Sequence, residues 1–179
     1  MEALIPTEVT TERLVLRRPV EADAEGLVPV FGDPEVVRYL SGEVADHDAI
    51  WRAVAEWLGH WDMRGYGLWT WVERATGTVV GRGGLFYPAG WPQLEVGWTL
   101  GRAHWGRGYA TEAGRAALDV AWAHLRPEWV CSVIHPENAA SQQVAKRLGG
   151  RLDHRDRVRG TDVDIWRYDR PTVGPGSEI

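Results

Sequence analysis

The chain has 179 residues, a formal net charge of −5, 44% apolar and 25% charged residues. This length and composition predict a soluble globular protein with one substantial core, and the acidic balance disfavours binding along nucleic acid and favours cationic or amine partners. The single cysteine, Cys131, excludes an intramolecular disulfide. No stretch approaches the ~20 apolar residues of a membrane helix, and the first residues lack an apolar signal region, so we expect a cytoplasmic protein without a membrane partner.

The first third of the chain predicts one strand followed by helices. A strand is expected over residues 13–18, helices over 21–31 and 46–63, and a short helical turn over 33–39. In the longest helix, apolar residues recur with a period of about 3.6 residues. Asp46 is its expected N-cap and Gly65 its expected end.

The rest of the chain mixes strands and helices. Three strands over 67–73, 78–87 and 93–100 should be antiparallel, because their connections are too short for crossovers. A glycine-rich loop over 101–108 precedes a helix over 110–125. The residues expected on the inward face of this helix are small: Ala113, Ala116, Ala117, Val120 and Ala121. A strand over 129–135, a helix over 138–148 closed by Gly149-Gly150 and a strand pair over 151–155 and 163–169 follow.

This order predicts an α/β fold with one central, mixed and mostly antiparallel sheet and helices on both faces. We expect residues 1–171 to form a single domain and residues 172–179 to be a flexible tail.

Tryptophan is unusually frequent, with eleven Trp against two Phe. Trp can simply replace Phe in packing. Alternatively, Trp57, Trp61, Trp69 and Trp91 wall an aromatic substrate site, since tryptophan suits places where one edge is apolar and the indole N–H is wet.

The glycine-rich loop has the features of a diphosphate cradle. It joins a strand to a helix N-terminus, where unpaired N–H groups and a partial positive charge favour anions. Gly106 and Gly108 allow the backbone to approach an anion closely, because they have no Cβ. Arg107 adds a positive charge with a forked set of hydrogen-bond donors. A plain strand-to-helix turn is the alternative interpretation.

Two common nucleotide motifs do not fit this loop. A P-loop ends in Gly-Lys-Ser/Thr, which is absent here. The dinucleotide fingerprint requires a third glycine where this chain has Thr111, and an acidic residue where the next strand ends in His135-Pro136.

The segment Trp105-Gly-Arg-Gly-Tyr-Ala-Thr-Glu112 resembles the pyrophosphate loop of the GNAT superfamily of N-acetyltransferases. It is most like the branch that acetylates ribosomal-protein N-termini (alanine or serine). Residues 11–17, 76–81 and 138–149 resemble that branch's opening strand, central hairpin and pantetheine helix, in the right order. The sequence departs from the pattern at Gly149-Gly150, where Gly-Phe is common, which should alter local packing rather than cofactor binding.

The resemblance implies an acyl-coenzyme A N-acyltransferase domain that uses acetyl-CoA as cosubstrate. The oxyanion donor would be a backbone N–H near Gly97-Trp98-Thr99, and Asn138 would contact the pantetheine amides, although it could also be only an N-cap. The implied cofactor-binding residues are Trp98, Thr99, Leu100, Trp105, Gly106, Arg107, Gly108, Tyr109, Ala110, Thr111, Asn138 and Ser141.

Acetyl transfer to an amine requires a base for the amine and an acid for the leaving thiolate. Glu95 is the candidate base, since it is a carboxylate in an apolar strand and shares a face with Gly97 and Thr99. Ser141, one helical turn after Asn138, is the candidate acid. Glu95 could instead face solvent or pair with a neighbouring strand, and Ser141 could be an ordinary first-turn hydroxyl.

Cys131 and His135 lie about 13 Å apart along one strand, too far for a nucleophilic pair. The histidines show no metal-ligand spacing, so we expect no metal. The acceptor is an amine, either a small molecule or a protein N-terminus, and the protein is a monomer or homodimer. A noncatalytic acyl-CoA sensor and a small-molecule binder with a Trp-rich cleft remain alternatives.

Overall fold

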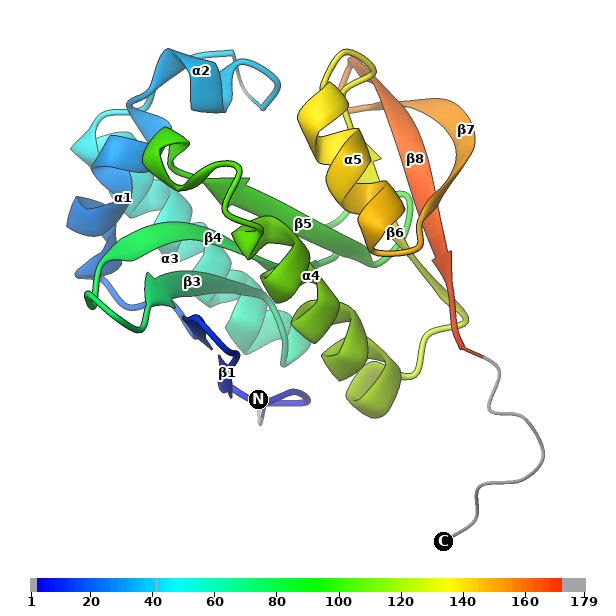
Figure 1. Ribbon diagram of the computed structural model, residues 1–179, viewed down its shortest axis with the longest axis horizontal. Coiled ribbons are helices and arrows are strands. Elements are labelled where there is room, and N and C mark those ends of the chain that lie inside the picture. The colour runs from blue at the N-terminus through cyan, green and yellow to red at the C-terminus, as the bar shows by residue number, and fades with distance from the viewer. Residues whose placement is uncertain (1–2, 41, 172–179) are drawn as a thin grey trace, which may run out of the picture.

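Eight strands form one mixed sheet in the computed structural model, which describes residues 3–40 and 42–171 (Figure 1). The strands are β1 (Glu8–Thr10), β2 (Leu14–Arg17), β3 (Leu68–Glu73), β4 (Val79–Phe86), β5 (Glu95–Leu100), β6 (Trp129–Ile134), β7 (Arg151–Val158) and β8 (Thr161–Asp169). The spatial order is β1-β2-β3-β4-β5-β6-β8-β7, with β5 and β6 parallel and the other neighbours antiparallel. The predicted mixed, mostly antiparallel sheet is confirmed.

Helices cover both faces of this sheet, as predicted (Figure 1). They are α1 (Asp23–Phe31), α2 (Pro34–Val37), α3 (His47–Arg64), α4 (Tyr109–Val120) and α5 (Ala139–Arg147). The predicted ends of α3 are confirmed: Asp46 accepts a hydrogen bond from the Ala49 N–H, and Gly65 ends the helix in the left-handed conformation. None of the helices in the described part of the chain is long and apolar enough to cross a membrane.

The register of β4 and β5 fixes which side chains share a face. Arg82 lies opposite Thr99, and Phe86 lies opposite Glu95. Since directly opposed residues point to the same side of a sheet, Arg82, Glu95 and Thr99 lie on one face. The face shared by Glu95, Gly97 and Thr99 is therefore as predicted.

The tryptophans divide between the two interpretations. Trp61 and Trp69 are buried in the core and hydrogen-bond backbone carbonyls, so these two are packing residues. Trp57 and Trp91 instead line a cavity described below. The predicted aromatic wall is wrong for the first pair, because their rings fill the space between the sheet and the helices around it.

Several boundaries differ from the predictions. Strand β1 was not expected, because only three residues pair with β2 at the sheet edge. The glycine-rich loop contains a 3-10 turn over Arg102–His104, and α4 continues as a π-helical turn over Ala121–Leu125. Strands β7 and β8 are longer than predicted, because cross-strand pairs such as Arg155–Asp164 extend an exposed hairpin. The tail predicted over 172–179 lies outside the described residues.

Candidate active site

The candidate site lies where β5 and β6 separate. Within the described residues these parallel strands share one paired position, Glu95 with Cys131. Two cavities of about 590 and 530 Å³ adjoin there. We name them the loop cavity, which Gly106, Gly108 and α5 line, and the tryptophan cavity, which Trp57 and Trp91 line. Their shared lining residues are Tyr39, Leu40, Trp98, Thr99, Asn138 and Ser141.

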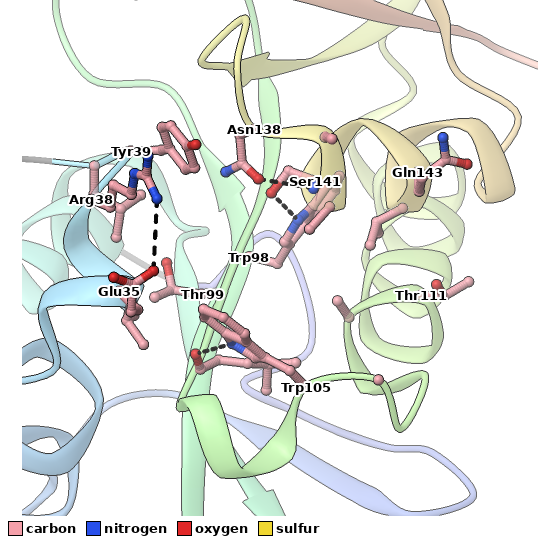
Figure 2. A pocket seen from close by; sticks show the side chains of 18 of the residues that line it. Glu35, Arg38, Tyr39, Trp98, Thr99, Trp105, Thr111, Asn138, Ser141 and Gln143 are labelled. Atoms are coloured by element: carbon pink, nitrogen blue, oxygen red, sulfur yellow. Dashed lines mark hydrogen bonds and ion pairs between the residues drawn. The ribbon is translucent and has the colours of Figure 1, made fainter.

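The loop cavity brings together most of the residues predicted to bind the cofactor. Its lining includes Trp98, Thr99, Leu100, Trp105, Gly106, Gly108, Ala110, Thr111, Asn138 and Ser141. They come from β5, the glycine-rich loop and the N-terminal turns of α4 and α5. Figure 2 shows Trp98 and Ser141 next to one another on the wall of this cavity.

The backbone of the glycine-rich loop fits an anion. Gly106 and Gly108 have φ values of +72° and +82°, in the left-handed region that favours glycine. Gly108 caps α4 without a side-chain hydrogen bond, and the first α4 N–H bonded to a helical carbonyl is that of Glu112. The preceding N–H groups therefore remain available, as the diphosphate of coenzyme A requires.

The side chains of Arg107 and Tyr109 do not line the loop cavity. Arg107 pairs with Glu73 at 2.9 Å and stacks 4.8 Å over the Tyr109 ring. The Tyr109 hydroxyl also donates to Glu73. The Arg107 guanidinium is held by the Glu73 carboxylate and its side chain is 48% exposed, so its contact with a diphosphate stays a prediction. Their backbone N–H groups still belong to the loop.

The turn between β1 and β2 braces the loop. Arg13 donates to the Arg107 carbonyl at 2.7 Å and to Glu112 on α4 at 2.7 Å. The Thr11 hydroxyl donates to the same Glu112 carboxylate at 2.6 Å. These bonds tie the loop and the α4 N-terminus to the β1–β2 turn, so they hold the loop in this conformation.

The N-terminus of α5 forms the junction of the two cavities. Asn138 Oδ1 accepts from the Ser141 N–H at 3.1 Å, so Asn138 is an N-cap. Its side chain also lines both cavities. Ser141 Oγ accepts from Trp98 Nε1 at 3.3 Å, which fixes the hydroxyl at the junction (Figure 2).

Glu95 lines the tryptophan cavity and is 9% exposed. Its carboxylate accepts from Trp91 Nε1 at 2.7 Å and from the Val133 N–H at 3.3 Å. Burial raises the pKa of Glu95 to about 7, although these hydrogen bonds and the charge of Arg82 oppose the rise. Glu95 therefore does not face solvent, and its carboxylate pairs with the neighbouring strand β6 through the Val133 N–H, as the alternative interpretation held. With a pKa of about 7 it can also exchange a proton near neutral pH.

Sequence reasoning missed two groups of lining residues. Tyr39 and Leu40, just after α2, line both cavities, and no sequence pattern places this connection there. Arg82 lines the tryptophan cavity. Its signal was present, since it is the only charge in the strand Val79–Phe86.

Cys131 and His135 form no pair within the described residues. The Cys131 thiol is buried and contacts the Gln93 carbonyl at 3.7 Å, and burial raises its pKa. The His135 ring accepts from the Glu137 N–H in its own loop and packs against Tyr39. The thiol is a packing group, as the sequence indicated.

Comparison with known proteins agrees with this geometry. The Acetyltransferase (GNAT) domain profile matches residues 13–151. The chain is 26% identical to "Uncharacterized N-acetyltransferase p20" of Bacillus licheniformis, over 88% of this chain and 92% of that one. A solved crystal structure, that of an acetyltransferase from Agrobacterium tumefaciens, is 33% identical to this chain in sequence. The two structures match with a TM-score of 0.80 over 92% of this chain and 94% of that one.

A further solved structure shares the fold alone. It is a ribosomal L7/L12 α-N-protein acetyltransferase in complex with coenzyme A, 18% identical, with a TM-score of 0.72 over 92% of this chain and 97% of that one. The profile match spans most of the chain, and the loop and sheet have the arrangement that the resemblance implied. The chain belongs to the GNAT acetyltransferase family.

Proposed function

We propose that the protein transfers the acetyl group of acetyl-CoA to a primary amine, on a protein N-terminus or a small molecule, by direct attack in a ternary complex. The observation that carries the proposal is the meeting of two cavities at Ser141. One cavity offers backbone N–H groups suited to a diphosphate, and the other holds a buried carboxylate. Two substrates can therefore approach one another from opposite sides of a junction.

The loop cavity supplies the cofactor contacts. N–H groups between Gly106 and Thr111 bind the diphosphate, and the Asn138 amide binds the pantetheine arm. Leu94 and Val96 present their carbonyls to β6, so alternate residues of β5 face that edge. The Trp98 N–H therefore points into the gap between β5 and β6, where it can stabilise the oxyanion.

The residues at the junction then perform the proton transfers. Glu95 accepts a proton from the acceptor's ammonium group, directly or through water, which frees the lone pair of the amine. The amine nitrogen then forms the new bond to the acetyl carbon, and the carbon–sulfur bond breaks as the nitrogen loses its second proton to solvent. Ser141 donates its hydroxyl proton to the thiolate and recovers one from solvent. The bound acetyl-CoA supplies the activated thioester, and the protein supplies position and proton transfer.

The experiment measures coenzyme A binding by calorimetry and thiol release from acetyl-CoA with an amine panel. The panel contains amino acids, polyamines, aminoglycosides and peptides that begin with Ser, Thr or Ala. We expect binding, and release that depends on an amine. The Ser141→Ala variant should bind coenzyme A normally and turn over about 10²-fold more slowly.

The other outcomes separate the alternatives. Binding without release by any amine would identify a noncatalytic sensor. Failure to bind coenzyme A would overturn the proposal and leave the tryptophan cavity as a binding site for another small molecule. Equal rates for wild type and the Ser141→Ala variant would remove Ser141 from the mechanism.

A further inference from the structure

Arg82 is a half-buried cation that lines the tryptophan cavity. Its guanidinium lies 4.9 Å from the Trp57 ring centroid and 5.6 Å from that of Phe31. Its Nε is enclosed, and within residues 3–40 and 42–171 no group accepts a hydrogen bond from it. A buried donor without an acceptor is unfavourable, so the guanidinium has donor capacity left for a ligand in the cavity.

A second arginine faces the same cavity from the β7–β8 turn. Arg159 has a φ of +48°, which is uncommon for a residue other than glycine. Its guanidinium lies 5.2 Å from the Trp91 ring centroid, and Trp91 in turn donates to Glu95. The wall of the cavity that holds the candidate base therefore carries two arginines stacked on tryptophans.

The charge in the cavity differs from that of the whole chain. The net charge of −5 favours cationic partners, whereas Arg82 and Arg159 line the cavity together with the carboxyls of Glu56 and Glu95. A polycationic acceptor would bring further positive charge beside two arginines. An acceptor with an amine and an anion matches both signs.

We propose that the acceptor carries a carboxylate as well as its amine, with the carboxylate bound by Arg82 and Arg159 and the amine directed to Glu95. This inference rests on the proposed function and names its acceptor class. A guanidinium stacked on rings keeps its in-plane edge free, and that edge matches a carboxylate with two parallel hydrogen bonds.

The register sets the length of this acceptor. Arg82 lies opposite Thr99, four residues along β5 from Glu95, which is about 13 Å at the usual rise of a strand. The Arg82 and Glu95 charges attract each other across this separation. We therefore expect a carboxylate separated from the amine by several bonds, as in a dipeptide or an ω-amino acid, to be a better acceptor than a simple α-amino acid.

The test uses thiol release with matched acceptors. Amino acids, ω-amino acids and dipeptides are each assayed as the free carboxylate and as the carboxamide, with phosphomonoester amines as a separate arm. We expect kcat/KM to be about 10- to 100-fold higher for the best carboxylate than for its carboxamide, as for a charge-assisted contact. In the Arg82→Gln variant this ratio should approach one, while coenzyme A affinity is retained.

Arg167→Gln is the matched control, because Arg167 also stacks on a tryptophan, 4.7 Å from the Trp129 centroid, but lines neither cavity. It should keep the wild-type ratio. A wild-type ratio near one, or a preference for the phosphomonoesters, overturns the inference while leaving acetyl transfer intact. Absence of thiol release with every amine contradicts the proposed function instead. The wild-type ratio decides even if Arg82→Gln fails to fold.

Discussion

Glu95 is a single residue whose surroundings set its chemistry. The other residues of its strand, β5, are apolar or neutral. The carboxyl is buried where β5 and β6 begin to separate, and it accepts a hydrogen bond from Trp91. Burial raises its pKa to about 7. A carboxyl with that pKa is divided between its two protonation states at neutral pH, which is the condition that favours a general base.

We predict that Glu95→Gln lowers kcat/KM at pH 7 by about 10²-fold or more, because most alkyl amines are then protonated and lose their proton acceptor. In the wild type the carboxylate form increases as pH rises through about 7, so the rate should rise over that range. In the variant this rise should be absent, and activity should recover only where the free amine forms unaided. A pH–rate profile from about pH 6 to about pH 10, either side of that pKa, with one confirmed acceptor measures both effects.

Coenzyme A affinity serves as the internal control for this variant. Glu95 does not line the loop cavity, so the dissociation constant should be unchanged. A variant profile that superimposes on the wild-type profile would show that water, or the equilibrium of the amine itself, replaces Glu95 as the base.

At the scale of elements, the glycine-rich loop and α4 act together. The loop supplies backbone N–H groups, α4 supplies its partial positive charge, and Arg13 and Glu112 keep the two in place. Gly108 joins the loop to the helix: it lines the loop cavity and is the N-cap of α4, with a φ of +82°.

We predict that Gly108→Val weakens coenzyme A binding by about 10- to 100-fold, because a branched side chain strains this backbone and separates the diphosphate from the N–H groups. Isothermal titration at neutral pH measures the change. Gly108→Ala provides a milder version if the valine variant does not fold.

Gly77 is the matched control for the loop variant. It has a similar φ of +72°, with open space where a Cβ would lie, but it belongs to the β3–β4 turn and lines neither cavity. Gly77→Val should lose stability without losing affinity. Equal loss of affinity in both variants would show that backbone strain causes the effect, and it would contradict the hypothesis that the loop N–H groups bind the diphosphate.

Elements were easier to predict from the sequence than the directions of side chains. Periodicity, caps and glycines placed α3, α4, α5 and the central strands, because these signals act locally. The Arg107 side chain could not be placed, because its partner Glu73 is distant in sequence. The glycine at position 150, where the family commonly has Phe, could not be explained from the sequence for a similar reason. A Cβ there would lie 2.7 Å from the ring of Tyr168, which is distant in sequence and occupies the space of a side chain.

At the scale of the whole molecule, the site depends on a sheet that opens in the middle. β5 and β6 diverge after one paired position in the described chain, so little backbone pairing joins the two sides of the sheet. The Ser132 hydroxyl, which donates to the Val96 carbonyl at 2.7 Å, adds one bridge. Each side must therefore be held together by its own contacts.

Asp23 holds the N-terminal side together. Its carboxylate accepts from Arg17 on β2 at 2.6 and 2.8 Å, from the Thr70 hydroxyl on β3 at 2.7 Å and from the Val20 N–H at 2.9 Å. Burial alone would raise its pKa, but these bonds outweigh burial and hold the pKa of Asp23 below its usual value. Its stabilisation is thus present at neutral pH and is lost as pH falls below about 4, through the lowered pKa.

We predict that Asp23→Asn lowers the free energy of unfolding at pH 7 by about 2 to 4 kcal/mol, because it leaves Arg17 without its charge partner and disturbs the Thr70 bond. The range lies somewhat below that of a fully buried pair, since the Arg17 side chain is 29% exposed. Urea denaturation at neutral pH measures the change. As the pH falls from about 4 toward the lowered pKa of Asp23, the difference between wild type and variant should shrink, because the unfolded state takes up a proton before the native state does.

The neighbouring pair of Arg18 and Asp62 is the control, since it has the same 2.6 Å contact with side chains 35% and 65% exposed. Exposed pairs contribute about 0 to 1 kcal/mol, so Asp62→Asn should leave the unfolding midpoint almost unchanged. If the two variants lose equal stability, burial is not the source of the Asp23 effect. If Asp23→Asn loses stability equally at neutral and at acidic pH, the effect comes from packing rather than from charge, and the N-terminal side of the sheet is held by its apolar core.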